Sequence, residues 1–563
     1  MRSRLTRRRC SFALPSARTL RMRLLLLRRL AEREAFSERN HSPTCNVDAI
    51  MGDFCVSPPR NLSDADHNRC IRESPDVLSV QSPRTETESD DVQSMSCEIG
   101  EHDCTAIDLT TSPTPCDEAR SFLASWVLNT NTSAWAVNKL LEGLRKFIPS
   151  LPKDYRTLMK TPRTTNEMEV HPGTYGHMGI IDGLKMAYRC ESVPTYQSIH
   201  LQLHVDGFSP FNSSGVQVWP ILCRSVAPLI SHPFLVGVYS GPRKPWNVHH
   251  FLAPLVTELR TLLRTGVMLP GRSTPNAVRI SNIICDAPAR SYVKRSKAHS
   301  GYGSCDKCVQ RGVYVSGKVT FPCTDCRLRT NESFRAHCRS KWSPFEYLPI
   351  DMVEQFPIDY MHAVCLGVMR RLISLWTTAA ASKDFRLDMD TVSRLNDVLD
   401  MNRCHWPRDF PRRCRSVDKF RWWKASEFRQ FLLYAGPAVL ADILPLDYYV
   451  NFLDLHLGIY LLCHPLLFRK CCSFAHNVLM VFISRFFKLY GAEEMTFNMH
   501  SLCHLAQDAY AHGTLDDFSA FPFESYIRCL KRRIRSPVNI VPQLLRRCME
   551  FQGNLCNGKW VLG

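Results

Sequence analysis

The sequence contains no long uninterrupted hydrophobic run. In 563 residues, the most apolar stretch lies around Phe431–Phe468, and polar residues interrupt it at Asp442, Asp447, Asn451, Asp454 and His456. A membrane-spanning helix needs about 18 or more consecutive apolar residues. The sequence therefore predicts no transmembrane helix, and we expect no membrane partner.

The cysteines lack the pattern of a disulfide framework. There are 25 of them, an odd number, and most stand singly in apolar segments, as Cys223, Cys285, Cys365 and Cys463 do. Single cysteines in apolar surroundings are typical of buried reduced thiols. Two C-x-x-C pairs favour metal binding in a reducing compartment over an oxidised secreted scaffold.

Positive charge exceeds negative charge, and the excess is unevenly distributed. Residues 1–45 hold 12 Arg, 3 Glu and no Lys, whereas residues 46–120 hold 16 acidic residues and 5 Arg. Residues 121–563 carry a net charge of +20, slightly more than the +18 of the whole chain. Clustered Lys and Arg release counterions when they neutralise phosphates. The basic block therefore favours a polyanionic partner.

Residues 1–120 lack the composition of a folded domain. Residues 1–45 form an Arg-rich extension, whose Leu24–Leu27 run is too short for a secretory signal sequence. The same residues also fit a mitochondrial presequence, and Met51 offers an alternative start. Residues 46–120 are rich in Ser, Pro, Asp, Glu and Thr, so apolar burial cannot offset the entropy of ordering. We expect a disordered acidic linker there.

The first ordered segment, residues 121–190, is expected to be a helical lead-in. Apolar residues recur at helical spacing from Val137 to Ile148, after an N-cap candidate at Asn131–Ser133. A second short helix is expected through Tyr155–Met159. Two helices joined by a tight turn fit a helix-turn-helix DNA reader, and they equally fit a small helical cap on the next domain.

A change of period predicts strands in residues 195–298. The alternation over Leu201–Asp206 is typical of a half-buried strand. An acid stands at the end of the first and of the last strand of the segment, so we expect an α/β fold with an RNase H-like core. The other expected elements are strands at Val216–Ser225 and Pro233–Ser240, a helix at His249–Thr265, and a strand at Ile280–Cys285.

After residue 298 the sequence changes from a strand pattern to a cysteine-containing segment and then to a helical pattern. Residues 299–340 form a zinc-knuckle-like segment, and residues 341–510 are mostly helical by period, with almost no strand signal. Residues 511–563 contain a basic helix at Phe521–Arg535, which we assign to the last part of the core. On this interpretation, a long helical insertion splits the RNase H-like core in two.

Three acids are the candidate catalytic residues: Asp206, Asp286 and Glu524. Mg²⁺ and Mn²⁺ prefer carboxylate oxygens, and Mg²⁺ sites need few protein ligands because several waters stay bound. Two such ions about 3.5–4 Å apart can stabilise the attacking and leaving oxygens of a phosphoryl displacement. Acids on two neighbouring strands and a facing helix would surround that pair. An acid at a strand end is often only a solvated cap, so the residue types alone do not establish the site.

Four sequence blocks stand in a characteristic order along the chain. They are Leu203–Phe208 with Val218–Leu222, Ile284–Arg290, the D-x-x-H element Asp359–His362, and Phe521–Glu524 with Leu530–Arg532 and Arg535. Taken together, they resemble the blocks of the CACTA-type (En/Spm-like) DDE transposases and of the animal transposase-domain proteins related to them. The match covers roughly residues 121–550.

The resemblance implies a nuclear DNA transposase, or a transposon-derived protein, with a helical insertion in the long stretch between Asp286 and Glu524. Asp206, Asp286 and Glu524 would bind Mg²⁺ or Mn²⁺, and Asp359 and His362 would be accessory residues. The enzyme would cut a transposon end and use the freed 3′-hydroxyl to attack target DNA. Its partners would be double-stranded DNA and further copies of the chain.

Two other function classes fit the same residues. Because no clear zinc finger precedes residue 121, the chain could be a domesticated protein that binds DNA or chromatin without cutting it. It could also be a zinc-stapled interaction module in which the three acids are structural caps.

A second candidate site is a zinc site. His299, Cys305 and Cys308 form an H-x5-C-x2-C pattern that matches the family, and Cys323 and Cys326 follow as a second C-x-x-C pair. Thiolates held in two knuckles suit tetrahedral Zn²⁺. The second pair has no clear counterpart in the family, so His299, His337 or Cys338 could complete the ligand set instead.

Two further groups of residues have weaker signals. His500 and His504 are four residues apart but lack the Glu of a zinc-protease motif, so we interpret them as structural. Basic residues after Glu524 could contact DNA phosphates, or simply form a solvated helix face. Three of them, residues 531–533, also fit a nuclear localisation signal. The basic residues are Arg528, Lys531, Arg532, Arg533 and Arg535.

Overall fold

The computed structural model describes residues 115–130, 132–189, 197–211, 214–336, 342–379, 383–407, 410 and 412–554. The Arg-rich extension and nearly all of the expected acidic linker lie outside these residues, as do His337 and Cys338. All described elements belong to the unit Thr111–Val561. Among the described helices, none is long and apolar enough to span a membrane.

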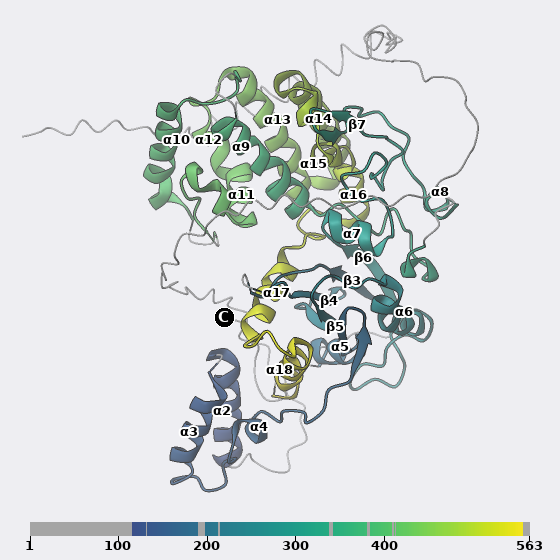
Figure 1. Ribbon diagram of the computed structural model, residues 1–563, viewed down its shortest axis with the longest axis vertical. Coiled ribbons are helices and arrows are strands. Elements are labelled where there is room, and N and C mark those ends of the chain that lie inside the picture. Colours follow the sequence, from purple (N-terminus) through teal and green to yellow (C-terminus); the bar gives the residue numbers. More distant parts are fainter. Residues whose placement is uncertain are drawn as a thin grey trace, which may run out of the picture. The chain divides into compact units, whose positions relative to one another are not determined.

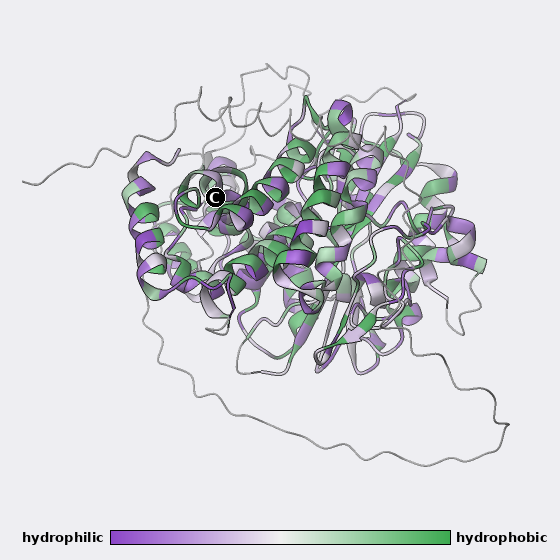
Figure 2. Cartoon of the chain, turned by 90° about the horizontal axis from the view of Figure 1, so that it is seen from above, coloured by the Kyte–Doolittle hydropathy of each residue, from purple (hydrophilic) through white to green (hydrophobic). Residues whose placement is uncertain are grey.

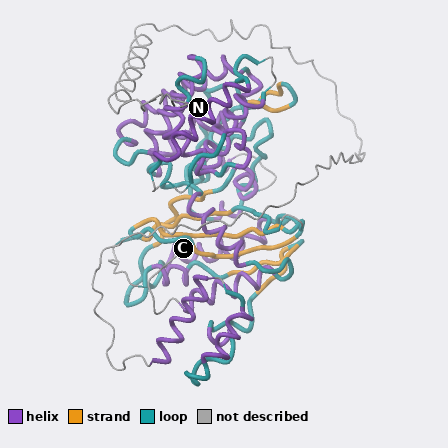
Figure 3. Tube along the Cα trace, turned by 90° about the vertical axis from the view of Figure 1, so that its left-hand side faces the viewer, coloured by secondary structure: helices purple, strands orange, loops and turns teal. Residues whose placement is uncertain are grey.

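A six-stranded mixed sheet lies at the centre of a mixed α/β fold (Figures 1 and 3). Neighbouring strands pair antiparallel except β3 and β6, which run parallel. Helix α6 (Val248–Thr265) lies in the crossover that this parallel pair requires. In spatial order the strands are β1 (Glu167–Val170), β2 (Gly173–His177), β5 (Phe234–Gly241), β4 (Gln217–Ala227), β3 (Ile199–Val205) and β6 (Val278–Ile284).

Strands β3 to β6 and helix α6 lie within one or two residues of the predicted elements. The prediction that β3 is half-buried was wrong. Its polar residues Gln202 and His204 are 1% and 0% exposed, because β3 lies inside the sheet and its second face is also covered. Helix α17 (Phe521–Arg533) contributes to that cover, and its Phe523 ring stacks on His204 with centroids 4.7 Å apart.

The segment predicted as a helical lead-in, residues 121–190, contains helices and also two strands of the sheet. Helix α3 (Ala134–Leu144) begins where predicted, and its N-cap Ser133 accepts a hydrogen bond from the Ala136 amide. Helix α2 (Pro115–Thr130) was not predicted, and it starts inside the expected linker. The prediction was also wrong for the end of the segment, because β1 and β2 form a hairpin there. Helix α5 (Ile181–Ala187) follows.

The helix-turn-helix interpretation finds little support in the second helix. Helix α4 (Tyr155–Leu158) has only one turn, and it packs on helix α18 (Ile540–Asn554). The Tyr155 hydroxyl donates to Glu550 at 3.0 Å, and the Thr161 hydroxyl contacts the same carboxylate. These contacts favour the helical-cap interpretation.

Residues 344–512 are mostly helical in their described parts, as predicted, and contain no strand there. Helix α13 is apolar on almost all sides, as expected for a helix buried in a core. Its buried Asn451 donates to the Phe482 carbonyl at 2.9 Å. The elements, with η marking 3-10 and π helices, are η2 (Pro344–Tyr347), η3 (Met361–Met369), α9 (Arg370–Thr378), α10 (Met389–Asn402), η4 (Arg403–His405), η5 (Val417–Trp422), α11 (Ala425–Gln430), η6 (Phe431–Ala435), α12 (Gly436–Val439), α13 (Leu446–Cys463), α14 (Phe468–Tyr490), η7 (Ala492–Glu494), α15 (Phe497–Ser501), η8 (Leu502–His504) and α16 (Leu505–His512).

Hydrophobic cores cover both faces of the sheet. One core joins Leu222, Leu235 and Ile284 to the helices of residues 361–548, and the other joins alternate strand residues such as Leu203 and Ile283 to α5 and α6. Most packed helices carry both hydrophobic and hydrophilic residues in Figure 2. Between β6 and the helical region lie α7 (Ala287–Val293), β7 (Val313–Val315), β8 (Lys318–Thr320) and α8 (Asn331–Ala336).

Candidate metal centres

The three predicted acids come from three separate elements. Asp206 directly follows β3, Asp286 is the N-cap of α7 just after β6, and Glu524 lies in the first turn of α17. Strands β3 and β6 run parallel, with His204 opposite Ile284. Because parallel strands end at the same edge of a sheet, Asp206 and Asp286 emerge side by side.

Asp206 and Glu524 meet at this edge together with His204. One ligand atom from each of these three residues lies within 4.8 Å of the other two. Asp286 is not in that set, but its charge raises the pKa of both Asp206 and Glu524. Two hydrogen bonds hold the strand-end acids: Asp206 Oδ1 accepts from Gly207 N, and Asp286 Oδ1 from Ala289 N, both at 2.6 Å.

Asp206, Asp286 and Glu524, called the acid cluster below, bring three carboxyl groups together in a largely buried position. Burial raises the pKa of Asp206 to about 8, with further contributions from Asp286 and Glu524 that outweigh the opposing charge of His362. Burial also raises the pKa of Glu524, although His362 and Lys531 lower it. Carboxyl groups this close together repel one another when ionised. A bound cation would remove that repulsion and so stabilise the ionised forms.

The predicted accessory residues Asp359 and His362 lie beside the acids. Asp359 is buried, and its Oδ2 lies 2.5 Å from His362 Nδ1. Its Oδ1 accepts from the amide of Ala520, the N-cap of α17, at 2.8 Å, so Asp359 also holds the helix that carries Glu524. Burial opposes protonation of His362, but the bond to Asp359 and the nearby carboxylates raise its pKa to about 9.

His204 was not singled out from the sequence. It stands two residues before Asp206, which places both side chains on the same face of β3. That spacing was the only available signal, because a polar residue on an alternating strand normally faces water. Burial lowers the pKa of His204 to about 3, so the ring is neutral in the folded protein.

A second group of ligand atoms joins the first knuckle to two distant histidines. Cys305, Cys308, His500 and His504 are all buried, and one ligand atom from each lies within 4.8 Å of the others. His500 and His504, interpreted from the sequence as structural, therefore belong to a group that could hold a metal ion. Their spacing of four residues in the sequence was the signal, but nothing local connected them to cysteines 192 and 199 residues earlier.

The measured separations fit one tetrahedral ion. Cys308 Sγ lies 3.3 Å from His500 Nε2, Cys305 Sγ lies 3.6 Å from His504 Nε2, and the two Nε2 atoms are 3.3 Å apart. Tetrahedral Zn²⁺, with bonds of about 2.3 Å to sulfur and about 2.0 Å to nitrogen, sets such separations at about 3.3–3.6 Å. A hydrogen bond from Cys308 and the two imidazoles hold the pKa of the Cys305 thiol well below its ordinary value.

The other predicted zinc ligands lie outside this group. Cys323 and Cys326 have their sulfurs 3.4 Å apart, but Cys323 is exposed and neither belongs to the set of four. Cys326 packs against the cluster of Cys305 and Cys308 without joining it. The His299 ring contacts Phe497 edge-on at 6.3 Å.

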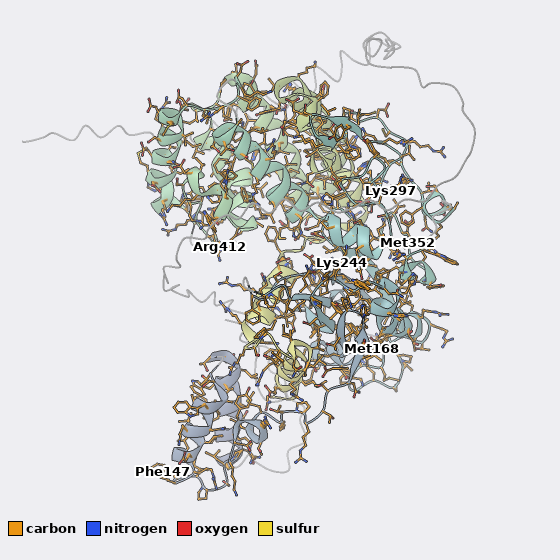
Figure 4. The ribbon with its side chains drawn as sticks, in the orientation of Figure 1. Phe147, Met168, Lys244, Lys297, Met352 and Arg412 are labelled. Carbon is orange, nitrogen blue, oxygen red and sulfur yellow. The ribbon has the colours of Figure 1, made fainter. Side chains whose placement is uncertain are left out.

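Asp306 and Lys307, the two residues between Cys305 and Cys308, link the thiol–imidazole group to the acid cluster. Asp306 Oδ2 lies 2.5 Å from Lys294 Nζ and 3.4 Å from Arg290 Nε, so it is paired with residues in and just after α7, the helix that Asp286 caps. Lys307 Nζ lies 2.6 Å from Asp508 Oδ1 and donates to the Val353 carbonyl at 2.8 Å. Met352, the residue before Val353 in the sequence, is labelled in Figure 4. A short segment after β6 therefore supplies every charged side chain of this network except that of Asp508.

The same network of contacts reaches the accessory pair. Asp508 Oδ2 accepts from the amide of Ile358, the residue before Asp359, at 2.8 Å. Asp286, Asp359 and His362 also line one small cavity together with Phe497 and Ser501 of α15, the helix that carries His500. The zinc-type centre and the acid cluster are therefore adjacent and share buried contacts.

The basic residues in and just after α17, which ends at Arg533 and not at the predicted Arg535, divide into two kinds. Arg528 and Lys531 are exposed and follow Glu524 at i+4 and i+7, so they share its face of the helix. Arg532 is also exposed. Arg533 instead donates to Cys548 Sγ at 3.5 Å and lies over the Phe551 ring, and Arg535 donates to the Thr132 carbonyl at 3.1 Å.

The arrangement can hold a divalent cation among carboxylates and, separately, a tetrahedral cation among thiolates and imidazoles. The two sites draw on different ligand chemistry, oxygen-rich in one and sulfur-rich in the other. No family model matches the chain, and no curated protein matches it.

Proposed function

We propose that the chain is a DDE-type DNA transposase, or a protein derived from one, with Asp206, Asp286 and Glu524 as its catalytic acids. The observation that carries the proposal is the convergence of these acids. Asp206 and Glu524 are far apart in the sequence, yet their carboxylates meet at the sheet edge where Asp286 emerges.

The topology supports an RNase H-like core. The strands β5, β4 and β3 run antiparallel in that order, and β6 joins β3 in parallel after helix α6. The core was predicted from this same succession of three strands, a helix and a fourth strand in the sequence. The helical residues 344–512 separate β6 from α17, as expected for an insertion between the second and third acids.

The acid cluster fits a divalent cation. Asp206, Glu524 and Asp286 would hold Mg²⁺ or Mn²⁺, which are hard cations that prefer oxygen ligands. When bound, such ions activate a hydroxyl nucleophile and stabilise the charge that develops on a phosphodiester. Asp359 orients His362 beside the acids, where the protonated ring can balance negative charge from the carboxylates or from a DNA phosphate.

Positive charge next to the acids supports a DNA substrate. Arg528 and Lys531 extend the Glu524 face of α17 outward, and contacts of such residues with the phosphate backbone position DNA without reading its sequence. A nuclear location and assembly into oligomers on DNA complete the proposal.

We also propose that Cys305, Cys308, His500 and His504 bind one structural Zn²⁺. All four protein ligands are buried, which leaves no open position for a substrate. Closed four-ligand sites are characteristic of structural zinc. The ion would join the knuckle to helices α15 and η8.

A nicking assay tests the catalytic proposal. The purified chain would be incubated with Mn²⁺ and a duplex carrying the terminal repeats that flank its coding locus. We expect nicking by the wild type and none by Asp206→Ala or Glu524→Ala, whereas Asp182→Ala, an exposed acid on α5, should cut normally. Equal nicking by Asp206→Ala would refute the assignment. Binding of the duplex without nicking would favour the domesticated, non-cutting alternative.

A further inference from the structure

His204 is a buried histidine whose ring nitrogens have no hydrogen-bond partner among the described residues. The side chain is 0% exposed, and neither Nδ1 nor Nε2 meets hydrogen-bond geometry with any described group. The backbone of Ile284 on β6 lies close to the ring without completing such a bond. Buried polar groups are almost always partnered, so this exception calls for an explanation.

The neighbouring polar residue on the same strand face behaves differently. Gln202 donates to the Asp517 carbonyl at 3.1 Å and accepts from Arg224 Nε at 2.7 Å. This face of β3 therefore can satisfy buried polar groups. At His204, however, the neighbouring side chain is aromatic and not polar: the Phe523 ring stacks on the His204 ring with an interplanar angle of 9°.

His204 and two carboxyl residues could hold one ion between them. A nitrogen of His204, an oxygen of Asp206 and an oxygen of Glu524 lie within 4.8 Å of one another. A neutral imidazole has one lone pair, and a carboxylate that has lost its proton offers only lone pairs. A divalent cation can accept a lone pair from each of these three residues at once.

We propose that His204 is a nitrogen ligand of the divalent ion held by Asp206 and Glu524. The inference rests on the proposed function and adds a ligand to its site. Ligand atoms on opposite sides of an ion with bonds of about 2.1 Å lie about 4.2 Å apart, which the three separations allow. The Phe523 stack fixes the plane of the ring, and Phe523 precedes Glu524 in α17, so one helix sets the position of two ligands.

The nitrogen ligand has a consequence for metal choice. Sites made only of oxygens suit both Mg²⁺ and Mn²⁺, whereas an imidazole ligand favours transition-metal ions over Mg²⁺, and Mn²⁺ accepts carboxylate and imidazole ligands together. The site should therefore bind Mn²⁺ more tightly than Mg²⁺, and His204 should be the residue that creates this preference.

Pulsed electron paramagnetic resonance with Mn²⁺ tests the proposal directly. The full chain would be purified with zinc retained, so that Mn²⁺ does not enter the thiolate site, and then titrated with Mn²⁺ alone. We expect ¹⁴N coupling from a directly bound imidazole in the wild type. His204→Phe, which keeps the aromatic stack, should lose the coupling and bind Mn²⁺ about tenfold more weakly, with Mg²⁺ binding less affected.

Matched variants separate the outcomes. His362→Gln should keep the ¹⁴N signal, because His362 is bonded to Asp359 through Nδ1. If the signal is absent from the wild type, persists in His204→Phe, or is lost in His362→Gln, the proposal is overturned. His204→Gln serves as a second variant should the Phe variant fold poorly. Mn²⁺ binding that survives in Asp206→Asn would instead refute the proposed metal site itself.

Discussion

Replacing Asp206 by asparagine should stabilise the metal-free protein and abolish its response to divalent cations. Asparagine has nearly the same shape as aspartate but carries no charge. The substitution removes a carboxylate that burial and the neighbouring Asp286 and Glu524 make difficult to ionise. A higher free energy of unfolding in the variant would show that the wild-type carboxylate destabilises the metal-free protein.

The size of the effect follows from the pKa of Asp206. The carboxyl has a pKa of about 8 in the folded protein and 3.8 ordinarily, so the fold favours the protonated form. The resulting destabilisation begins near pH 4 and grows as pH rises toward 8. At about 1.36 kcal/mol per pH unit, it reaches at most about 4 kcal/mol at pH 7. Because asparagine still buries a polar amide at this site, which offsets part of the gain, we expect about 2 kcal/mol.

Thermal unfolding at pH 7, in magnesium-free buffer with zinc retained, measures this gain. We expect Tm of Asp206→Asn to exceed that of the wild type by about 2–4 °C, and the difference to shrink at pH 5. Adding Mn²⁺ should raise Tm of the wild type and leave the variant unchanged. Asp182→Asn, on the exposed surface of α5, is the matched control and should behave as the wild type does.

Two results would refute the reasoning. A variant less stable than the wild type in metal-free buffer would show that Asp206 makes favourable contacts rather than costly ones. A variant stabilised by Mn²⁺ as much as the wild type would place the cation elsewhere.

Three further predictions concern zinc, pH and DNA. Cys305→Ser should lose the bound zinc and much of the stability, whereas Cys323→Ser should keep both, as measured by elemental analysis and thermal unfolding; equal loss in the two would contradict the four-ligand site. The affinity for Mn²⁺ should rise with pH up to about 8, with proton release detectable by calorimetry in two buffers, because protonated Asp206 must lose its proton first; a flat profile would count against this. Lys531→Ala should weaken DNA binding and reduce its salt dependence by about one phosphate contact, whereas Arg533→Ala, which removes packing on α18, should lower Tm instead, and the opposite pattern would reverse the assignment.

The sequence predicted the inner strands of the sheet because their apolar residues alternate with polar ones or run continuously, and turn residues bound them. It did not predict the β1–β2 hairpin, whose strands are short and contain exposed Glu167 and Glu169 and two glycines. Helix α2 was missed because it opens with Pro115, Asp117 and Glu118 in a polar segment that resembles a linker. These are helix-start signals, but they were obscured by the surrounding composition.

The candidate metal centres were predictable only where their residues follow a local pattern. The three acids were found through strand ends and the resemblance, and Cys305 and Cys308 through their spacing. His500 and His504 belong to the same centre as those cysteines but come much later in the sequence, so only the tertiary fold could assign them. Likewise, the burial of His204 depends on α17, which lies near the other end of the chain.

Both metal centres are completed by one short stretch late in the chain. His500 and His504 close the thiolate site, and Glu524 closes the acid cluster soon afterwards, while Cys305 and Asp206 are synthesised much earlier. A nascent chain therefore carries open thiols and unpaired acids throughout the synthesis of the helical region. A product that terminates before residue 500 lacks His500, His504 and Glu524, so it cannot assemble either candidate centre or the proposed catalytic site.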